Sequence, residues 1–116
     1  MASFCFDWDD TLVDAQTQQW LDGAERTLRH LYLRGHTLTV MSARARFPVG
    51  RQQIEDRLAE IGVPLEVHAK PAADLYVDDR AYPFDGDWDA LIRQIRRGDY
   101  PRPRRRRHLT ATQESA

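Results

Sequence analysis

The stretch SFCFDWDDTLVD, residues 3–14, decides how the rest of this 116-residue chain is interpreted. Its first four residues are an apolar run that suits a short buried strand. Aspartates follow at positions 7, 9, 10 and 14. Carboxylates crowded together raise one another's pKa unless a cation lies between them. We therefore expect residue 7 to mark the end of a strand that delivers acidic side chains to a functional site.

Strand and helix patterns alternate along the rest of the chain. Four runs of apolar and β-branched residues are expected as strands: residues 3–6, 36–42, 65–69 and 74–77. Three segments with apolar residues at helical spacing are expected as helices: residues 17–34, 51–60 and 87–97, with Asp87 as N-cap of the last. Strands connected by helices form parallel sheets through right-handed crossovers. The sequence therefore predicts a three-layer α/β fold.

Composition places the chain among globular proteins. The hydrophobic share is 41% and the charged share 30%, and a chain of this length holds one domain. No apolar stretch approaches the length of a membrane span, and the N-terminus lacks the pattern of a secretory signal, so a cytoplasmic location is expected. Cys5, the only cysteine, is expected to fill the core beside its strand.

The C-terminal end differs from the body in charge. Residues 1–98 are expected to form the domain and residues 99–116 a disordered tail, because prolines and polar residues dominate there. The tail carries five arginines: Arg102, Arg104, Arg105, Arg106 and Arg107. We expect this cluster to allow non-specific contact with nucleic acid.

Polar side chains stand at the end of every expected strand. The first strand is followed by Asp7, Asp9 and Thr11, the second by Ser42 and Arg44, the third by Lys70 and the fourth by Asp78 and Asp79. Ligands of open parallel sheets bind at the carboxyl ends of the strands. The clustered carboxylates suit Mg²⁺, and the cations beside them suit an anion such as phosphate.

The same residues resemble the four motifs of the haloacid dehalogenase superfamily of phosphatases. DWDDT, a hydrophobic strand ending in Ser42, Lys70 and LYVDD occur in the order of that family, over residues 4 to about 97. The resemblance implies a Rossmann-like fold with a parallel sheet in the order 3-2-1-4-5. The intervals at residues 12–35 and 43–69 are too short for a cap domain, so a capless form is expected.

The resemblance also implies a role for each motif position. Asp7 is expected as the nucleophile that forms a phosphoaspartate, and Asp9 as the general acid and base. Lys70 would offset negative charge at the reacting centre. Phosphate contacts are implied for Thr11, Ser42, Ala43 and Arg44, and Mg²⁺ ligands for Asp7, Asp9, Asp78 and Asp79.

Substrate choice stays open between two resemblances. GHTLTVMSAR resembles the phosphatase module of polynucleotide kinase-phosphatases, whereas KPAADLYVDDRA resembles small capless hydrolases, including those linked to capsular polysaccharide synthesis. The expected substrate is therefore a nucleotide or polynucleotide end phosphate or a sugar phosphate. Two alternatives are a nucleic-acid-binding module that acts through the arginine tail and a non-catalytic phosphate-binding protein. The oligomeric state is left open.

Overall fold

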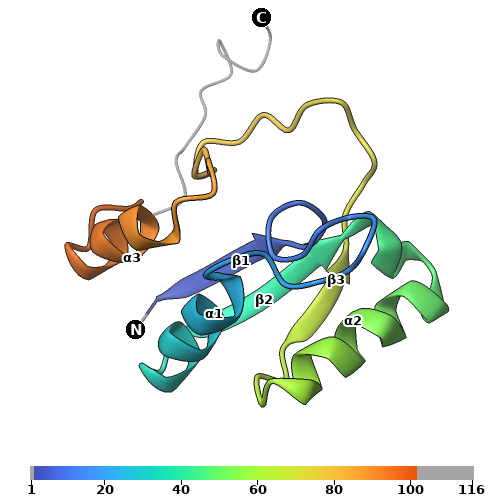
Figure 1. Ribbon diagram of the computed structural model, residues 1–116. Helices are drawn as coiled ribbons and strands as arrows, with labels where there is room; N and C mark the ends of the chain where they lie inside the picture. The colour runs from blue at the N-terminus through green and yellow to red at the C-terminus, as the bar shows by residue number, and fades with distance from the viewer. Residues whose placement is uncertain (1, 102–116) are drawn as a thin grey trace, which may run out of the picture.

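Three parallel strands form the centre of the molecule. The computed structural model describes residues 2–101 (Figure 1). The strands β1 (Ser3–Asp7), β2 (Thr37–Ser42) and β3 (Glu66–Ala69) lie in the order β1-β2-β3. In this register Phe6 lies opposite Val40, and Val40 lies opposite Val67. The α/β class and the parallel pairing expected from the sequence are therefore confirmed.

Helices follow each of the first two strands, and a further helix lies near the end of the described residues. Helix α1 (Ala24–Leu33) connects β1 to β2, and the 3₁₀ helix η1 (Ala43–Arg46) leads directly from β2 into α2 (Pro48–Glu60). Helix α3 (Trp88–Arg96) follows β3 after a long connection. Asp87 caps α3 as expected, since its Oδ1 accepts a hydrogen bond of 2.9 Å from the backbone N–H of Ala90.

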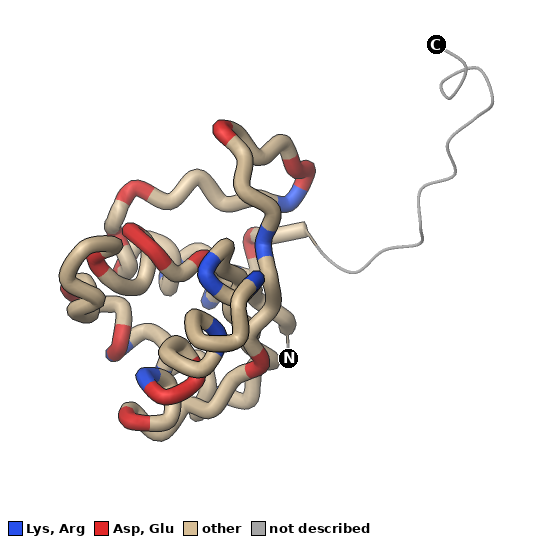
Figure 2. Tube along the Cα trace, turned by 90° about the vertical axis from the view of Figure 1, so that its right-hand side faces the viewer, with Lys and Arg blue, Asp and Glu red and all other residues tan. Residues whose placement is uncertain are grey.

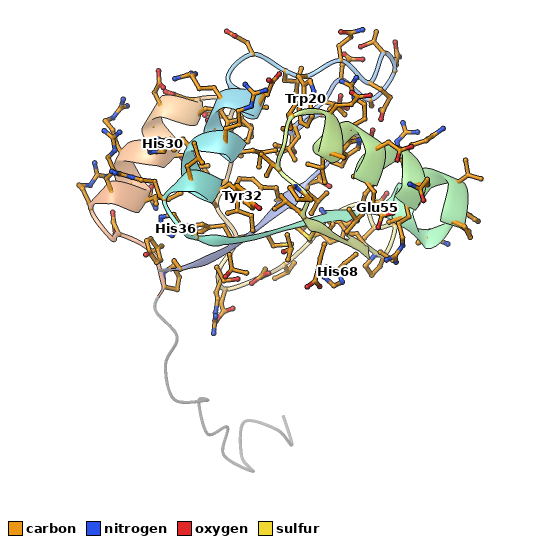
Figure 3. The ribbon with its side chains drawn as sticks, turned by 90° about the horizontal axis from the view of Figure 1, so that it is seen from below. Trp20, His30, Tyr32, His36, Glu55 and His68 are labelled. Atoms are coloured by element: carbon orange, nitrogen blue, oxygen red, sulfur yellow. The ribbon has the colours of Figure 1, made fainter. Side chains whose placement is uncertain are left out.

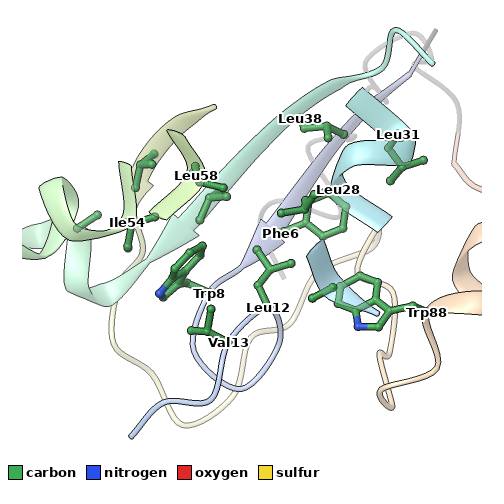
Figure 4. Close-up of a cluster of buried hydrophobic side chains, with 14 of the residues drawn as sticks. Phe6, Trp8, Leu12, Val13, Leu28, Leu31, Leu38, Ile54, Leu58 and Trp88 are labelled. Atoms are coloured by element: carbon green, nitrogen blue, oxygen red, sulfur yellow. The ribbon is translucent and has the colours of Figure 1, made fainter. Parts of the chain in front are cut away.

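The hydrophobic core lies between the sheet and the helices. Its buried side chains come from all three strands, from the loop after β1 and from α1, η1, α2 and α3. Figure 4 labels Phe6, Trp8, Leu12, Val13, Leu28, Leu31, Leu38, Ile54, Leu58 and Trp88. Trp8 is fully buried, although aspartates flank it on both sides. Alternation along the extended chain accounts for this, because successive side chains leave a strand on opposite faces.

The expectation of three layers was wrong for the described residues. The helices lie on one side of the sheet (Figure 3). Along β2 the side chains of Leu38 and Val40 are buried, whereas Thr39 and Met41 between them are only half-buried. Cys5 points to the less covered face and is exposed, so its expected place in the core was also wrong. A short strand run does not reveal whether one or both faces of its sheet are covered.

The expected fourth strand does not form. Residues 74–77 have no strand structure, and the sheet order 3-2-1-4-5 is reduced to three strands within residues 2–101. The connection between β3 and α3 instead rises away from the sheet (Figure 1). Leu75 and Val77 are 76% and 91% exposed. β propensity expresses packing on a half-buried pleated surface, and these two side chains have no such surface beneath them.

The first helix begins later than its apolar spacing suggested. A helix was expected over residues 17–34, but α1 starts at Ala24. Gly23 before it has φ +88°, a left-handed conformation that ends any helix approaching from the N-terminal side. Residues 8–22 form a looped segment instead, in which the backbone N–H groups of Leu12 and Val13 donate to the carbonyl of Trp8.

Tyr100, at the start of the expected tail, contacts the first strand. Residues 99–101 were assigned to a disordered tail, but the ring of Tyr100 packs edge-on against Phe4 with 5.4 Å between centroids. The rest of the expected tail, with all five of its arginines, lies outside the described residues. Within residues 2–101, no helix combines the length and the apolar character that crossing a membrane requires.

Gly50 controls how closely α2 approaches η1, and this gives a first prediction. A Cβ built at Gly50 would lie 2.2 Å from the backbone oxygen of Arg44, so Gly50→Ala forces the two helices apart. We expect a loss of about 1–3 kcal/mol in the free energy of unfolding, measured by urea denaturation. Val49→Ala, at the neighbouring position that is 70% exposed, should change it by less than about 0.5 kcal/mol. Equal stability of the two variants would contradict this close approach.

Candidate functional site

The carboxylate of Asp7 is held at the end of β1 by two side chains. The ammonium of Lys70, directly after β3, lies 3.4 Å from Asp7 Oδ1. The hydroxyl of Thr11 donates to Asp7 Oδ2 at 3.2 Å. Parallel pairing explains the meeting, because β1 and β3 both end beside the end of β2. The expected convergence of Asp7, Thr11 and Lys70 is therefore present.

Lys70 has a further partner that was not expected from its sequence position. Its ammonium lies 3.9 Å from the centroid of the Tyr76 ring, within the range of a cation–π contact. The Lys70 side chain is 14% exposed. Its backbone N–H donates to the carbonyl of Ser42 at 3.0 Å, which extends the β2–β3 pairing by one step. Backbone and ring together direct this cation toward Asp7.

Asp9 belongs to a second ion pair. The Nε–H of Arg44 lies 2.9 Å and 2.8 Å from the two carboxylate oxygens of Asp9, and its Nη2 donates to the carbonyl of Ala15 at 2.8 Å. Arg44 lies in η1, so the start of the second helical segment is tied to the loop after β1. Asp7 and Asp9 were both expected as Mg²⁺ ligands, and each contacts a different cationic side chain, Lys70 for Asp7 and Arg44 for Asp9.

Gln18 completes the surroundings of Asp9. Its Nε2 donates to Asp9 Oδ1 at 2.9 Å, and its Oε1 accepts from the indole N–H of Trp8 at 3.0 Å. Sequence reasoning missed this residue because a lone glutamine in a loop fits no motif. The buried Trp8 beside the acidic cluster was the available signal, since a buried indole N–H requires a partner.

A tight turn brings Gln18 back toward Asp9. Asp14 Oδ1 accepts hydrogen bonds of 2.9 Å from the backbone N–H groups of Gln16 and Thr17. The bonds from Thr17 and then Gln16 lower the pKa of Asp14, so the turn is fixed by an ionised carboxylate at neutral pH. The chain thereby reverses between Asp9 and Gln18.

Ser42 caps helix η1, and Ala43 is its first residue. Ser42 is 1% exposed, and its hydroxyl accepts a hydrogen bond of 3.1 Å from the backbone N–H of Arg44 as cap of η1. Ala43 is the exposed first residue of η1. Of the residues expected to contact phosphate, only Thr11 lines the cavity beside Asp7.

That cavity has a volume of about 630 Å³ and runs from Asp7 along β1 to α3. The connection between β3 and α3 closes its other side. One end carries polar and charged groups, and the remainder is largely apolar and aromatic: Phe4, Phe6, Tyr76, Tyr82, Phe84, Trp88, Leu91 and Ile95. Ring contacts such as Phe84 on Trp88, at 4.3 Å between centroids, hold the wall together. Small-molecule sites commonly combine such a wall with a few polar groups.

The two carboxylates expected from the fourth motif differ in position. Asp78 lines the cavity with Asp7 and Lys70, whereas Asp79 does not line it. Asp78 Oδ1 accepts a hydrogen bond of 2.8 Å from the backbone N–H of Arg80. No three acidic, histidine or cysteine side chains converge as a metal-binding group within residues 2–101. The donor set of Asp7 and Asp78 still suits Mg²⁺, which commonly takes one or two carboxylates and completes its shell with water or phosphate oxygens.

The arrangement provides three chemical capabilities at the carboxyl ends of the strands. Asp7 offers a carboxylate oxygen to a ligand in the cavity, and Lys70 offers positive charge beside it. Asp9 supplies a second carboxylate two residues further along the chain, which contacts Arg44 and does not line the cavity. Comparison with known protein families, curated proteins and solved structures found no match for this chain.

Proposed function

We propose that this protein is a phosphomonoester hydrolase that works through a phosphoaspartate on Asp7 and requires Mg²⁺. The observation that carries the proposal is the contact of 3.4 Å between Asp7 and Lys70 at one end of a cavity. A carboxylate beside an ammonium and an open space can accept a phosphoryl group while the cation offsets its charge. The resemblance of DWDDT and LYVDD to haloacid dehalogenase phosphatases points to the same chemistry.

The reaction divides into two displacements at phosphorus. An oxygen of Asp7 forms a bond to phosphorus while the bond to the ester oxygen breaks, and Asp9 donates a proton to that leaving oxygen. Asp9 then takes a proton from water, whose oxygen attacks phosphorus and breaks its bond to Asp7. Inorganic phosphate leaves, and both carboxylates return to their starting states.

Asp7 and Asp78 would hold the metal together with the backbone carbonyl of Asp9. Bound there, Mg²⁺ would supply Lewis-acid stabilisation and orientation of the phosphoryl oxygens. Lys70 would stabilise the same oxygens from the side of β3, and Thr11 would keep the Asp7 carboxylate oriented through its hydrogen bond. Lys70 and Thr11 already contact Asp7, so these two groups would need little reorganisation when substrate binds.

The proposal includes a sheet that extends beyond β1 in the order 3-2-1-4-5. Within the described sheet β1 pairs only with β2, so its other edge is free for a further strand. Residues 74–77 have the composition of a strand and end directly before Asp78. Drawing Asp78 toward Asp7 would bring these residues alongside β1. Their exposed apolar side chains Leu75 and Val77 would then gain packing partners.

Removal of the nucleophile tests the reaction. Asp7→Asn should reduce release of phosphate from p-nitrophenyl phosphate in Mg²⁺ by at least about 1,000-fold, because an amide oxygen is a poor nucleophile. Asp22→Asn serves as the matched control, since Asp22 is an exposed aspartate in the loop before α1. It should keep wild-type turnover. Substantial activity in Asp7→Asn with an unchanged circular dichroism spectrum would exclude the proposed nucleophile.

Hydrogen exchange tests the metal ligands and the extended sheet together. Addition of Mg²⁺ with inorganic phosphate should slow amide exchange in residues 3–7 and 74–77 and leave α2 unchanged, because strand pairing protects backbone N–H groups. Asp78→Asn should abolish the protection, whereas Asp79→Asn should retain it, since only Asp78 lines the cavity with Asp7. Equal exchange with and without the ions would refute the extension of the sheet.

The arginine cluster provides a test of the substrate class. Acidic and basic positions are intermixed over the described residues (Figure 2), so a concentrated positive charge comes from the sequence after Pro101. If polynucleotide ends are the substrate, truncation after Pro101 should raise KM for a phosphorylated oligonucleotide and flatten its salt dependence. Turnover of p-nitrophenyl phosphate should not change. Unchanged KM values at low and moderate salt would favour a sugar phosphate or another small substrate.

A further inference from the structure

Gln18 lies between a fully buried tryptophan and the carboxylate of Asp9. Its side-chain amide has a partner on every side: Oε1 accepts from the Trp8 indole, and Nε2 donates to Asp9 Oδ1 at 2.9 Å and to the carbonyls of Asp14 and Ala15 at 3.2 Å and 3.0 Å. The bonds to Asp14 and Ala15 are enough to complete the turn, so they do not account for the contact with Asp9.

The direction of this amide is fixed by chemistry. An indole N–H can only donate, so the side of the amide that faces Trp8 must be the oxygen. The NH₂ group therefore faces Asp9 and donates to it. Trp8 is packed in the core at 0% exposure. Its fixed indole therefore sets the orientation of the Gln18 amide, which in turn contacts the Asp9 carboxylate.

The backbone at Gln18 supports the same conclusion. Gln18 has φ +59°, a left-handed conformation that is uncommon for a residue with a side chain. It is held there by a bond of 2.8 Å from its N–H to the carbonyl of Asp14 and by a bond of 2.9 Å from Arg57 Nη2 to its own carbonyl. Sparsely populated backbone conformations that are held by several contacts tend to occur at functional sites.

The two oxygens of Asp9 consequently differ. Oδ1 accepts from both Gln18 and Arg44, whereas among residues 2–101 Oδ2 accepts from Arg44 alone. Gln18 and Arg44 together therefore hold the Asp9 carboxylate in one orientation. Gln18 therefore distinguishes the two oxygens without touching a ligand in the cavity.

We propose that Gln18 is a positioning residue for Asp9, oriented by Trp8. The inference rests on the proposed function for the acid–base role of Asp9. The contact itself and the orientation of the amide do not depend on that role. Gln18 thus connects the buried indole of Trp8 to the carboxylate of Asp9.

Two substitutions at Gln18 remove the donor while they preserve the size of the side chain. Gln18→Met lacks the amide, and Gln18→Glu replaces the donor by an acceptor that faces the Asp9 carboxylate. The matched control is Gln52→Met in α2, since Gln52 is exposed and donates at 2.8 Å only to its helical neighbour Asp56. All three variants are compared with the wild type at the same Mg²⁺ concentration, after circular dichroism has established that each is folded.

The kinetic readout depends on the leaving group. Gln18→Met should lower kcat for an alkyl phosphate roughly tenfold with KM unchanged, the effect of losing one hydrogen bond to a charged group. Its kcat for p-nitrophenyl phosphate should change much less, because that leaving group needs little protonation. Gln18→Glu should lose more on the alkyl phosphate, and Gln52→Met should match the wild type on both. A structural defect at residue 18 would instead slow both substrates equally.

A second measurement does not use turnover. In ¹H–¹⁵N spectra the side-chain amide protons of Gln18 should exchange with water more slowly than those of Gln52, because Gln18 donates to three acceptors in a half-buried turn. Trp8→Phe, which removes the indole N–H, should accelerate exchange at Gln18 and leave Gln52 unchanged. Equal exchange at the two glutamines in the wild type would overturn the proposed contact.

The outcomes separate this inference from the proposed function. Hydrolysis by the wild type, together with unchanged kcat on both phosphates in Gln18→Met, refutes the positioning role and leaves the phosphatase proposal intact. Absence of hydrolysis by the wild type on either phosphate refutes the phosphatase and, with it, the role in proton transfer. The exchange rates then decide separately whether Trp8 orients Gln18 as described.

Discussion

The pairing of β2 with a parallel neighbour on each side is the constraint on which the site depends. Because β1 and β3 flank β2 in one direction, their carboxyl ends lie about two strand spacings apart, close to 10 Å. The extended side chain of Lys70 reaches across much of that gap to Asp7, with the ring of Tyr76 beside it. An antiparallel neighbour would place the same residues at opposite ends of the sheet. The parallel direction of the strands therefore brings the Lys70 cation to the Asp7 carboxylate.

A second constraint keeps the two aspartates chemically distinct. Asp7 faces the cavity, while Asp9 is held by Arg44 and by Gln18 from the loop after β1. Each carboxylate therefore has its own cationic partner, Lys70 for Asp7 and Arg44 for Asp9. Trp8, which lies between the two aspartates in the sequence, is buried in the core.

Local sequence patterns predicted the elements that depend on neighbouring residues alone. The strands ending at Asp7 and Ser42, the cap Asp87 and the meeting of Asp7 with Lys70 all followed from apolar runs and strand direction. Predictions that depended on distant partners were wrong. The exposure of Cys5 and the missing strand at residues 74–77 follow from which faces and edges of the sheet are covered, and Gln18 matters only because a turn returns it to Asp9.

The exposed thiol of Cys5 offers an experimental probe of the less covered face of the sheet. As the only cysteine in the chain, it can be modified selectively without any substitution. It lies on β1 and lines the same cavity as Asp7 and Asp78. A small fluorinated group attached there would place an NMR reporter beneath the connection between β3 and α3. Its chemical shift would respond directly to any change in how that connection covers the sheet.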